Sequence, residues 1–287
     1  MNLQTSSDTP AGTATEPQSS GFSEHGRGEG VLGEVWSHRE LLFFFAWRDI
    51  KVRYKQTALG VVWAIIQPLL TMAIFTVIFG RFAHIPTPGV PKPIFYFSGL
   101  LPWLFLANTV PMASMSMVTN MQLLTKIYFP RVMLPISITI GGIVDFLIGS
   151  VLMVGFFFYY HIHPTLALLI WPVLVLQMFL LSMAISLFLS TLNVKFRDVK
   201  YAIPFAIQIW MFTTPVIYPP SILPAALRKW IALNPAAGLV DSFRHCLVPQ
   251  SPVRWSMEAI SAAVTVILFI GALAYFRKNE RAFADVI

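Results

Sequence analysis

The sequence predicts an all-α membrane protein with six transmembrane helices, an amino-terminal amphipathic interfacial helix, a short cytoplasmic helix and short outer re-entrant helices. Of the 287 residues, 56% are hydrophobic and 11% are charged, whereas a soluble domain carries about 25% charged residues. The mean hydropathy is +0.69. Several uncharged stretches reach the roughly 20 residues that cross a bilayer as a helix. With a single cysteine, Cys246, the chain also cannot be a disulfide-stapled secreted fold.

The chain divides into three predicted parts. Residues 1–30 are rich in Ser, Thr, Gly, Glu and Pro and lack the apolar core of a signal peptide, so we expect a disordered cytoplasmic tail. Residues 31–55 are too charged to span a membrane and predict an amphipathic helix along its surface. The basic residues that we place at this interface are Arg48, Lys51, Arg53 and Lys55. Residues 56–287 form the six-span domain.

Uncharged stretches predict the six crossings. They are residues 56–80, 104–120, the two halves of 132–194, 201–218 and 259–276. The stretch 132–194 is twice the necessary length, so we divide it at 161–164. Pro102 and Pro111 predict a kink, or a re-entrant segment, before the second crossing.

The basic residues set the orientation. With both termini in the cytoplasm, the outside holds few of the 20 Lys and Arg residues: Arg81, Lys92, Arg228, Lys229, Arg244 and Arg254. This distribution follows the positive-inside rule. Because basic residues next to the inner leaflet are expected from topology and anionic lipid alone, the net charge of +7 does not indicate nucleic-acid binding.

The predicted outer loop at residues 219–255 is longer than a connection requires. Loops beyond about 12–15 residues usually contain structure of their own. Helix-like patterns at 223–233 and 236–247, separated by Asn234 and Pro235, predict two short helices that dip into or lie on the outer leaflet.

Motifs for catalysis are missing from the sequence. No GxxxxGK[ST] phosphate loop is present, so the chain itself is not expected to bind ATP, and any ATP drive must come from a partner. Nor is there a CxxC, an HExxH or a nucleophile elbow. We therefore assign no catalytic, cofactor-binding or metal-binding residue.

Asp145 is the single formal charge within residues 132–194. An ionisable residue inside a membrane segment indicates a transport pathway, a proton relay or a partner charge. Gly141, Gly142 and Gly149 surround it and predict close helix packing, so Asp145 could equally hydrogen-bond a neighbouring helix. No second intramembrane charge is evident to complete an ion-coupled relay.

Aromatic residues cluster near the predicted outer half of the bundle. Most members of such clusters form an interfacial belt, but flat aromatic faces also stack on sugar rings and could line a conduit for a glycan. The residues that we assign to such a conduit are Phe95, Tyr96, Trp103, Phe157, Tyr159, Tyr160, Trp210 and Tyr218.

The inner segment 121–131 is short, amphipathic and ended by Pro130. A helix across the inner face could dock a cytoplasmic protein, although a plain interfacial turn is the alternative. The candidate anchors are Leu123, Leu124, Ile127, Tyr128 and Phe129, with Lys126 and Arg131 to set the register.

Six motifs in order carry a resemblance to a known family. They are RDIKVRYKQTALGVVWAIIQPLL at 48–70, KIYFPRVMLP at 126–135, NVKFRDVKYAIP at 193–204, TPVIYP at 214–219, LNPAAGLVDSFRHCL at 233–247 and FRKNERAFADVI at 276–287. On these motifs the chain resembles the transmembrane permease subunits of ABC exporters for polysaccharides, including O-antigen, capsule and teichoic acid.

The resemblance implies a homodimer in the bacterial inner membrane, with two copies of a separate ABC ATPase that binds ATP and Mg²⁺. The substrate would be an undecaprenyl-linked glycan. Segment 121–131 would be the coupling helix that contacts the ATPase, and 31–55 would lie at the interface near it.

Two other function classes remain open at this stage. Asp145 favours an ion-coupled secondary transporter or channel for a small solute. A membrane enzyme of glycan synthesis would need an acid–base pair, for which the outer loop offers Asp241, His245 and Glu258.

Overall fold

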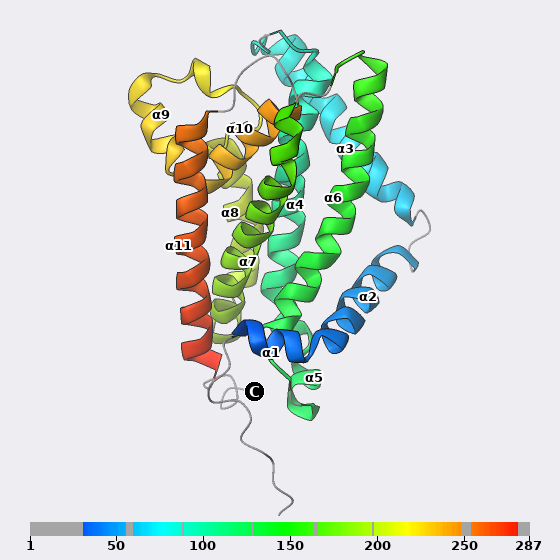
Figure 1. Cartoon of the computed structure of the whole chain (residues 1–287), viewed down its shortest axis with the longest axis vertical. Coiled ribbons are helices and arrows are strands. Elements are labelled where there is room, and N and C mark those ends of the chain that lie inside the picture. Colours follow the sequence, from blue (N-terminus) through cyan, green and yellow to red (C-terminus); the bar gives the residue numbers. More distant parts are fainter. Residues whose placement is uncertain are drawn as a thin grey trace, which may run out of the picture.

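The computed structural model describes residues 31–55, 60–87, 89–127, 129–163, 166–196, 198–247 and 254–280. Every regular element in these ranges is a helix. Figure 1 shows an elongated bundle with α1 (Val31–Ser37), α2 (Arg39–Lys55) and α5 (Met121–Lys126) at one end. The predicted tail at 1–30 lies outside the described residues.

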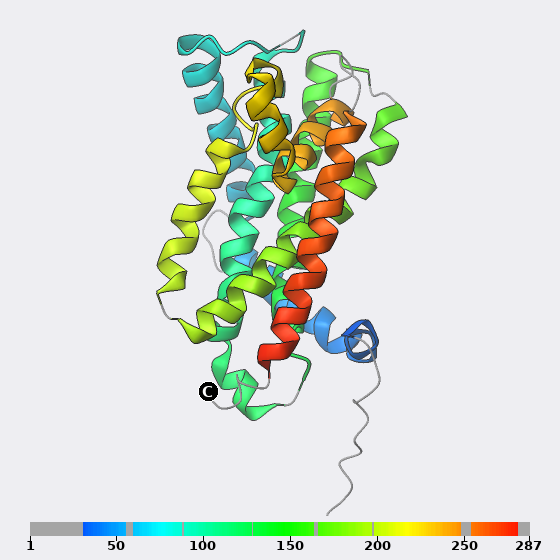
Figure 2. The same cartoon turned by 90° about the vertical axis from the view of Figure 1, so that its left-hand side faces the viewer.

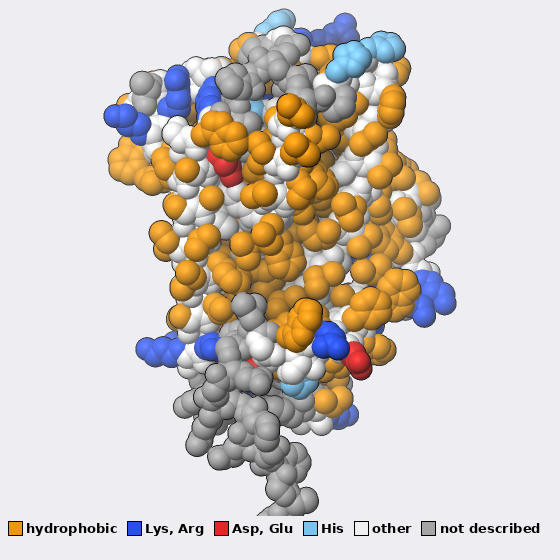
Figure 3. Space-filling model, viewed as in Figure 1, with side chains coloured by type: hydrophobic (Ala, Val, Ile, Leu, Met, Phe, Trp, Pro, Cys, Tyr) orange, Lys and Arg blue, Asp and Glu red, His pale blue; other side chains and the backbone are white. Residues whose placement is uncertain are grey.

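Five helical segments of the described chain are long and apolar enough to cross a membrane. The first joins α3 (Val61–Phe75) to the π-helix η1 (Thr76–Phe82), and the fourth joins the 3₁₀-helix η2 (Leu166–Ile170) to α7 (Trp171–Lys195). The other three are α4 (Lys92–Thr119), α6 (Met133–Tyr159) and α11 (Trp255–Glu280). Figure 3 shows a broad apolar surface between two ends that carry the charged side chains. The predicted class, an all-α multi-pass membrane protein, is confirmed.

The fifth predicted crossing, 201–218, contains a shorter helix. The helix α8 (Val199–Thr213) has 15 residues, which corresponds to about 22 Å against a hydrocarbon core of about 30 Å. Its end has a local cause, because Pro215 disfavours the α conformation at Thr214, which is extended. Figure 2 shows α8, in yellow-green, along the flank of the bundle.

The second crossing differs from the prediction. Instead of a helix at 104–120 after a kinked or re-entrant start, α4 runs without interruption from Lys92 to Thr119. Pro102 and Pro111 lie inside it. Its first half is buried in the main core, with Ile94, Phe97 and Leu100 inaccessible to solvent. Tertiary packing therefore holds the helix through both prolines.

The glycines of α6 allow close contact with α4. A Cβ on Gly142 would collide with Thr109 Oγ1, and one on Gly149 would collide with the Leu101 side chain. Gly141 has only an ordinary contact, with Ile50 of α2. Two of the three glycines thus have the packing role that the sequence predicts for them.

The predicted interfacial helix at 31–55 is two helices, α1 and α2, interrupted at His38. Phe45 and Ala46 are buried on the inner side of α2, where the Phe45 ring meets Phe129 at 5.3 Å. Glu34 of α1 pairs with Arg277 of α11 at 3.9 Å. The first described helix and the end of the last one therefore lie at the same end of the bundle (Figure 1).

The opposite end contains the two short helices that the sequence predicts in the long loop. They are α9 (Ala225–Ala232) and α10 (Pro235–Leu247), preceded by the 3₁₀-turn η3 (Pro220–Ile222). The Asn234 side chain accepts a hydrogen bond from the Ala236 amide and so caps α10. Nearly all of α10 is buried against α4, α7 and α11.

Candidate functional site

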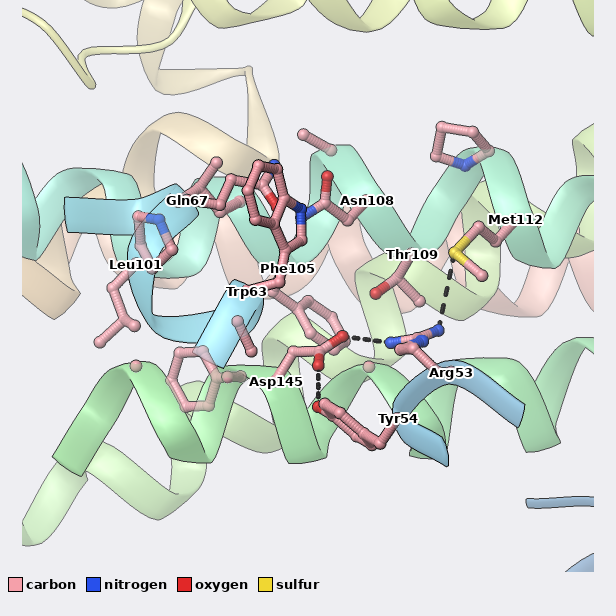
Figure 4. Close-up of a pocket in the computed structure, with 18 of the residues that line it drawn as sticks. Arg53, Tyr54, Trp63, Gln67, Leu101, Phe105, Asn108, Thr109, Met112 and Asp145 are labelled. Carbon is pink, nitrogen blue, oxygen red and sulfur yellow. Dashed lines mark hydrogen bonds and ion pairs between the residues drawn. The ribbon is translucent and has the colours of Figure 1, made fainter. Parts of the chain in front are cut away.

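A cavity of about 500 Å³ lies between α2, α3, α4 and α6. Its walls are mainly apolar, with Leu101, Phe105 and Phe146 among them. Figure 4 shows the polar and aromatic side chains around it, which come from all four helices: Arg53, Tyr54, Trp63, Gln67, Asn108, Thr109 and Asp145.

Asp145 has a partner charge in this cavity. Arg53 Nη1 donates to Asp145 Oδ2, and Tyr54 OH donates to Asp145 Oδ1. Arg53 also approaches the Met112 sulfur at 3.6 Å. Asp145 thus bonds to a neighbouring helix, which is one of the two interpretations of the sequence, and its partner charge comes from α2 and not from a membrane span.

Tyr54 is held in its protonated form. Burial, the hydrogen bond to Asp145 and the negative charge of Asp145 together raise the pKa of the Tyr54 phenol well above its ordinary value. Tyr54 consequently remains a hydrogen-bond donor to Asp145 at physiological pH.

A hydrogen bond between Ser137 and Asp49 also fastens α2 to the bundle. Arg48 contacts Asp49 at 2.8 Å, and Asp49 accepts a hydrogen bond of 3.0 Å from Ser137 of α6. Of the four basic residues predicted at the interface, Arg48 and Arg53 thus bind partners within the chain, whereas Lys51 and Lys55 are exposed.

The helix α5 is shorter than the predicted segment 121–131, since it ends at Lys126 and Ile127 is extended. Pro130 keeps the preceding residue out of the α conformation. Leu123 and Leu124 are half-buried, Lys126 and Ile127 are exposed, and Tyr128 lies outside the described residues.

Two predicted docking residues are instead used within the chain. Phe129 is buried against Phe45, and Arg131 donates to the Glu280 carbonyl at the end of α11. Both side chains connect segments at the end of the bundle where α5 lies. Lys126 and Ile127 are the residues of the predicted set that remain most open to a partner.

The aromatic residues predicted to line a conduit fall into different environments. Phe95, Tyr96 and Trp103 are buried in the main core of the chain. Trp103 meets Trp210 edge to face at 5.4 Å. The structure brings these rings together as packing partners, not around an open space within one chain.

The other conduit candidates lie closer to the surface. Phe157 lines a second, apolar cavity of about 780 Å³ near the ends of α6 and η2. Tyr159 is 76% exposed and Tyr160 is half-buried. Trp210 donates to Asn234 Oδ1 at 2.9 Å, and Tyr218 donates to the Phe212 carbonyl at 3.1 Å.

The candidate acid–base residues of the long loop are buried. His245 contacts Asp241 at 3.3 Å, and Glu258 accepts a hydrogen bond of 2.7 Å from Ser242. Each is less than a tenth exposed, enclosed by α10 and α11.

Sequence analysis did not assign a role in the fold or the site to Arg244. Its guanidinium donates to the carbonyls of Pro215 and Val216 at 2.9 Å and lies over the Phe95 ring. These contacts connect α10 to the chain after α8 and to α4.

Together these features describe a multi-pass membrane protein with a polar cavity between α2, α3, α4 and α6 and a buried polar cluster at α10 and α11. The model of the ABC-2 type transporter family matches residues 40–248. The chain belongs to this family.

Several characterised proteins are similar along most of the chain. The O-antigen export system permease protein RfbA of Myxococcus xanthus is 30% identical over 265 residues, which cover 90% of this chain and 99% of that protein. An RfbA of Klebsiella pneumoniae is 30% identical over 250 residues, covering 86% and 95%. The polysialic acid transport protein KpsM of Escherichia coli is 25% identical over 247 residues, covering 82% and 92%.

Proposed function

We propose that this chain is the transmembrane subunit of an ATP-driven exporter that moves a lipid-linked polysaccharide across the bacterial inner membrane. The observation that carries the proposal is the family match at residues 40–248, together with relatives named for O-antigen export or polysialic acid transport that align over most of the chain. An undecaprenyl-linked glycan is the substrate that we propose.

The energy comes from a separate ABC ATPase, present in two copies, that binds ATP and Mg²⁺. The lack of a phosphate loop in the sequence supports the assignment of ATP binding to a separate subunit. We assign the contact with the ATPase to α5 and the residues after it, with Lys126, Ile127 and Tyr128 as the main docking residues. Leu123 and Leu124 hold α5 against the bundle, since both are half-buried there.

The topology that we propose has six crossings and both termini in the cytoplasm. In this arrangement α8 is a short fifth crossing, α1 and α2 lie at the inner interface, and α9 and α10 lie in the outer leaflet. Charged side chains at both ends of an apolar surface support a membrane-spanning arrangement (Figure 3), and the excess of Lys and Arg on the proposed inner side supports this orientation.

We propose that the working unit is a homodimer. The helix α3 has no buried residue, and α8 exposes Tyr201, Phe205 and Ile209 along one face. A second copy would cover part of this apolar surface. Phe95, Tyr96 and Trp103 are buried within one chain, so we assign a conduit in the dimer to the predicted aromatic residues nearer the surface, such as Tyr159.

The main alternative, an ion-coupled transporter, drew its support from Asp145. The ion pair with Arg53 and the hydrogen bond from Tyr54 now account for this carboxylate. A structural tie between α2 and α6 explains Asp145 without a proton relay.

Depletion of the chain in a glycan-producing bacterium tests the proposal. We expect surface glycan to fall while lipid-linked polymer accumulates inside the cell, and we expect the intact chain to reverse both effects. Surface glycan that stays unchanged, with no internal polymer, would contradict the proposed function.

A further inference from the structure

We infer that the cavity between α2, α3, α4 and α6 is a subsite for a sugar unit of the transported glycan, with Gln67, Asn108 and Trp63 as its main contacts. The inference rests on the proposed function and adds to it the place on this chain where the glycan binds. Sequence analysis assigned this role to other aromatic residues and did not consider Trp63.

Two amide side chains face this cavity without a hydrogen-bond partner among the described residues. Gln67 of α3 and Asn108 of α4 both line the cavity and are exposed. Amide side chains in apolar membrane helices are costly unless they meet a polar partner. Their position on two facing helices indicates a polar ligand, which an amide can serve as both donor and acceptor.

The charge balance of the cavity argues for a neutral ligand. Its positive group, Arg53, and its negative group, Asp145, are paired with each other. A phosphate headgroup or a metal ion would have to break this pair, because the described part of the site offers no net charge. Sugar hydroxyls need no net charge and form hydrogen bonds with amide, hydroxyl and paired ionic groups alike.

Trp63 supplies an aromatic surface. It lines the cavity, and its side chain is 53% exposed, so a ring face is available to an incoming group. The apolar face of a sugar packs against such a ring while its hydroxyls reach the amides. Figure 4 shows Trp63, Gln67 and Asn108 on the same side of the cavity, opposite Tyr54.

The size of the cavity is consistent with a glycan that passes through it and not with one that is bound tightly as a whole. The volume of about 500 Å³ falls within the roughly 300–1,000 Å³ of small-ligand sites. It suits a short part of a glycan and not a whole polymer.

Site-specific photo-crosslinking tests the inference. The photoreactive residue p-benzoylphenylalanine replaces Gln67 or Asn108 in the chain, which is expressed with its ATPase in glycan-producing cells. Ile74 of α3 and Val118 of α4, exposed positions that do not line the cavity, receive the same replacement as controls. We expect glycan attached to the chain from Gln67 and Asn108, none from Ile74 and Val118, and none in cells that make no glycan.

Two results would overturn the subsite. One is phospholipid without glycan attached at Gln67 and Asn108 in complexes that still export, and the other is equal glycan attachment at all four positions. Both leave the proposed function intact, because export continues. Failure of the proposed function appears instead as unchanged surface glycan after depletion of the chain.

Substitution provides a second readout. Asn108→Leu and Gln67→Leu keep side-chain size but remove the hydrogen-bonding groups, and we expect each to slow export about threefold to tenfold at unchanged protein abundance. Thr119→Leu is the control, since Thr119 lies on α4 outside the cavity and bonds only to its own helix in the described structure. Equal export by all three variants would count against the subsite.

Discussion

Arg53 and Asp145 lie 92 positions apart and form one ion pair. Sequence analysis identified both residues but placed Arg53 at the membrane surface and did not say which residue of a neighbouring helix Asp145 would contact. Their pairing could not be predicted from spacing, because it depends on how α2 crosses α6. The close packing of Gly142 and Gly149 against α4 was predictable, because it depends only on the small size of glycine.

The ion pair gives the first prediction, which concerns stability. Arg53→Met leaves the Asp145 carboxylate without its cation, so we expect the chain to lose about 1–2 kcal/mol, less than for a fully buried pair because both side chains are partly exposed. The double variant Arg53→Met with Asp145→Leu should recover much of this loss. Denaturation of the purified complex in detergent measures the free energies, and strictly additive losses would refute the coupling.

Tyr159 allows a clean test of the predicted conduit. It is 76% exposed, and its one ring contact among the described residues is with Tyr160. Tyr159→Ala should therefore leave protein abundance unchanged and slow export about threefold if the ring contacts the glycan. The rate of surface-glycan appearance per chain is the measurement. A variant with wild-type export would remove Tyr159 from the conduit.

At the scale of elements, the sequence predicted helices correctly where they are short and bounded by proline. The helices α9 and α10 occur where the proline-rich loop predicts them, with Asn234 between them. The predicted start of the second crossing at 104 was wrong, because α4 begins at Lys92 and packing holds the helix through Pro102 and Pro111. The predicted length of α5 was also wrong, although Pro130 was read as its end.

Contact between α4 and α6 gives a prediction with a matched control. Gly142→Ala adds a methyl group that collides with Thr109, whereas Gly155→Ala on the same helix meets nothing within 4 Å. We expect Gly142→Ala to lower stability by about 1–3 kcal/mol and Gly155→Ala to have almost no effect. Thermal unfolding of the two purified variants makes the comparison, and equal stabilities would contradict the close contact.

The end of the bundle where α5 lies gives a prediction on coupling. Ile127→Glu and Lys126→Glu change exposed side chains next to α5, so the bundle should fold normally. If this surface docks the ATPase, we expect each change to reduce export about tenfold or more, as for a central interface residue. Lys278→Glu, an exposed lysine on α11, is the charge-matched control. Full ATP-driven export by the α5 variants would rule out this docking surface.

For the whole molecule, composition and charge distribution were enough to predict the membrane class and most of the crossings. The cavity between α2, α3, α4 and α6 was not predictable in the same way. Its polar residues come from four helices, and although Asp145 stood out as an intramembrane charge, Gln67, Asn108 and Thr109 each resemble an ordinary polar residue in an apolar helix. Only their common position distinguishes them.

The central claim is that this chain is the membrane subunit of an ATP-driven polysaccharide exporter. Purification of the tagged chain from its native membranes, with mass spectrometry of whatever remains bound, tests it most directly. We predict an ABC ATPase at one copy per chain. A homogeneous chain without an ATPase that moves a small solute in liposomes, driven by an ion gradient, would contradict the claim.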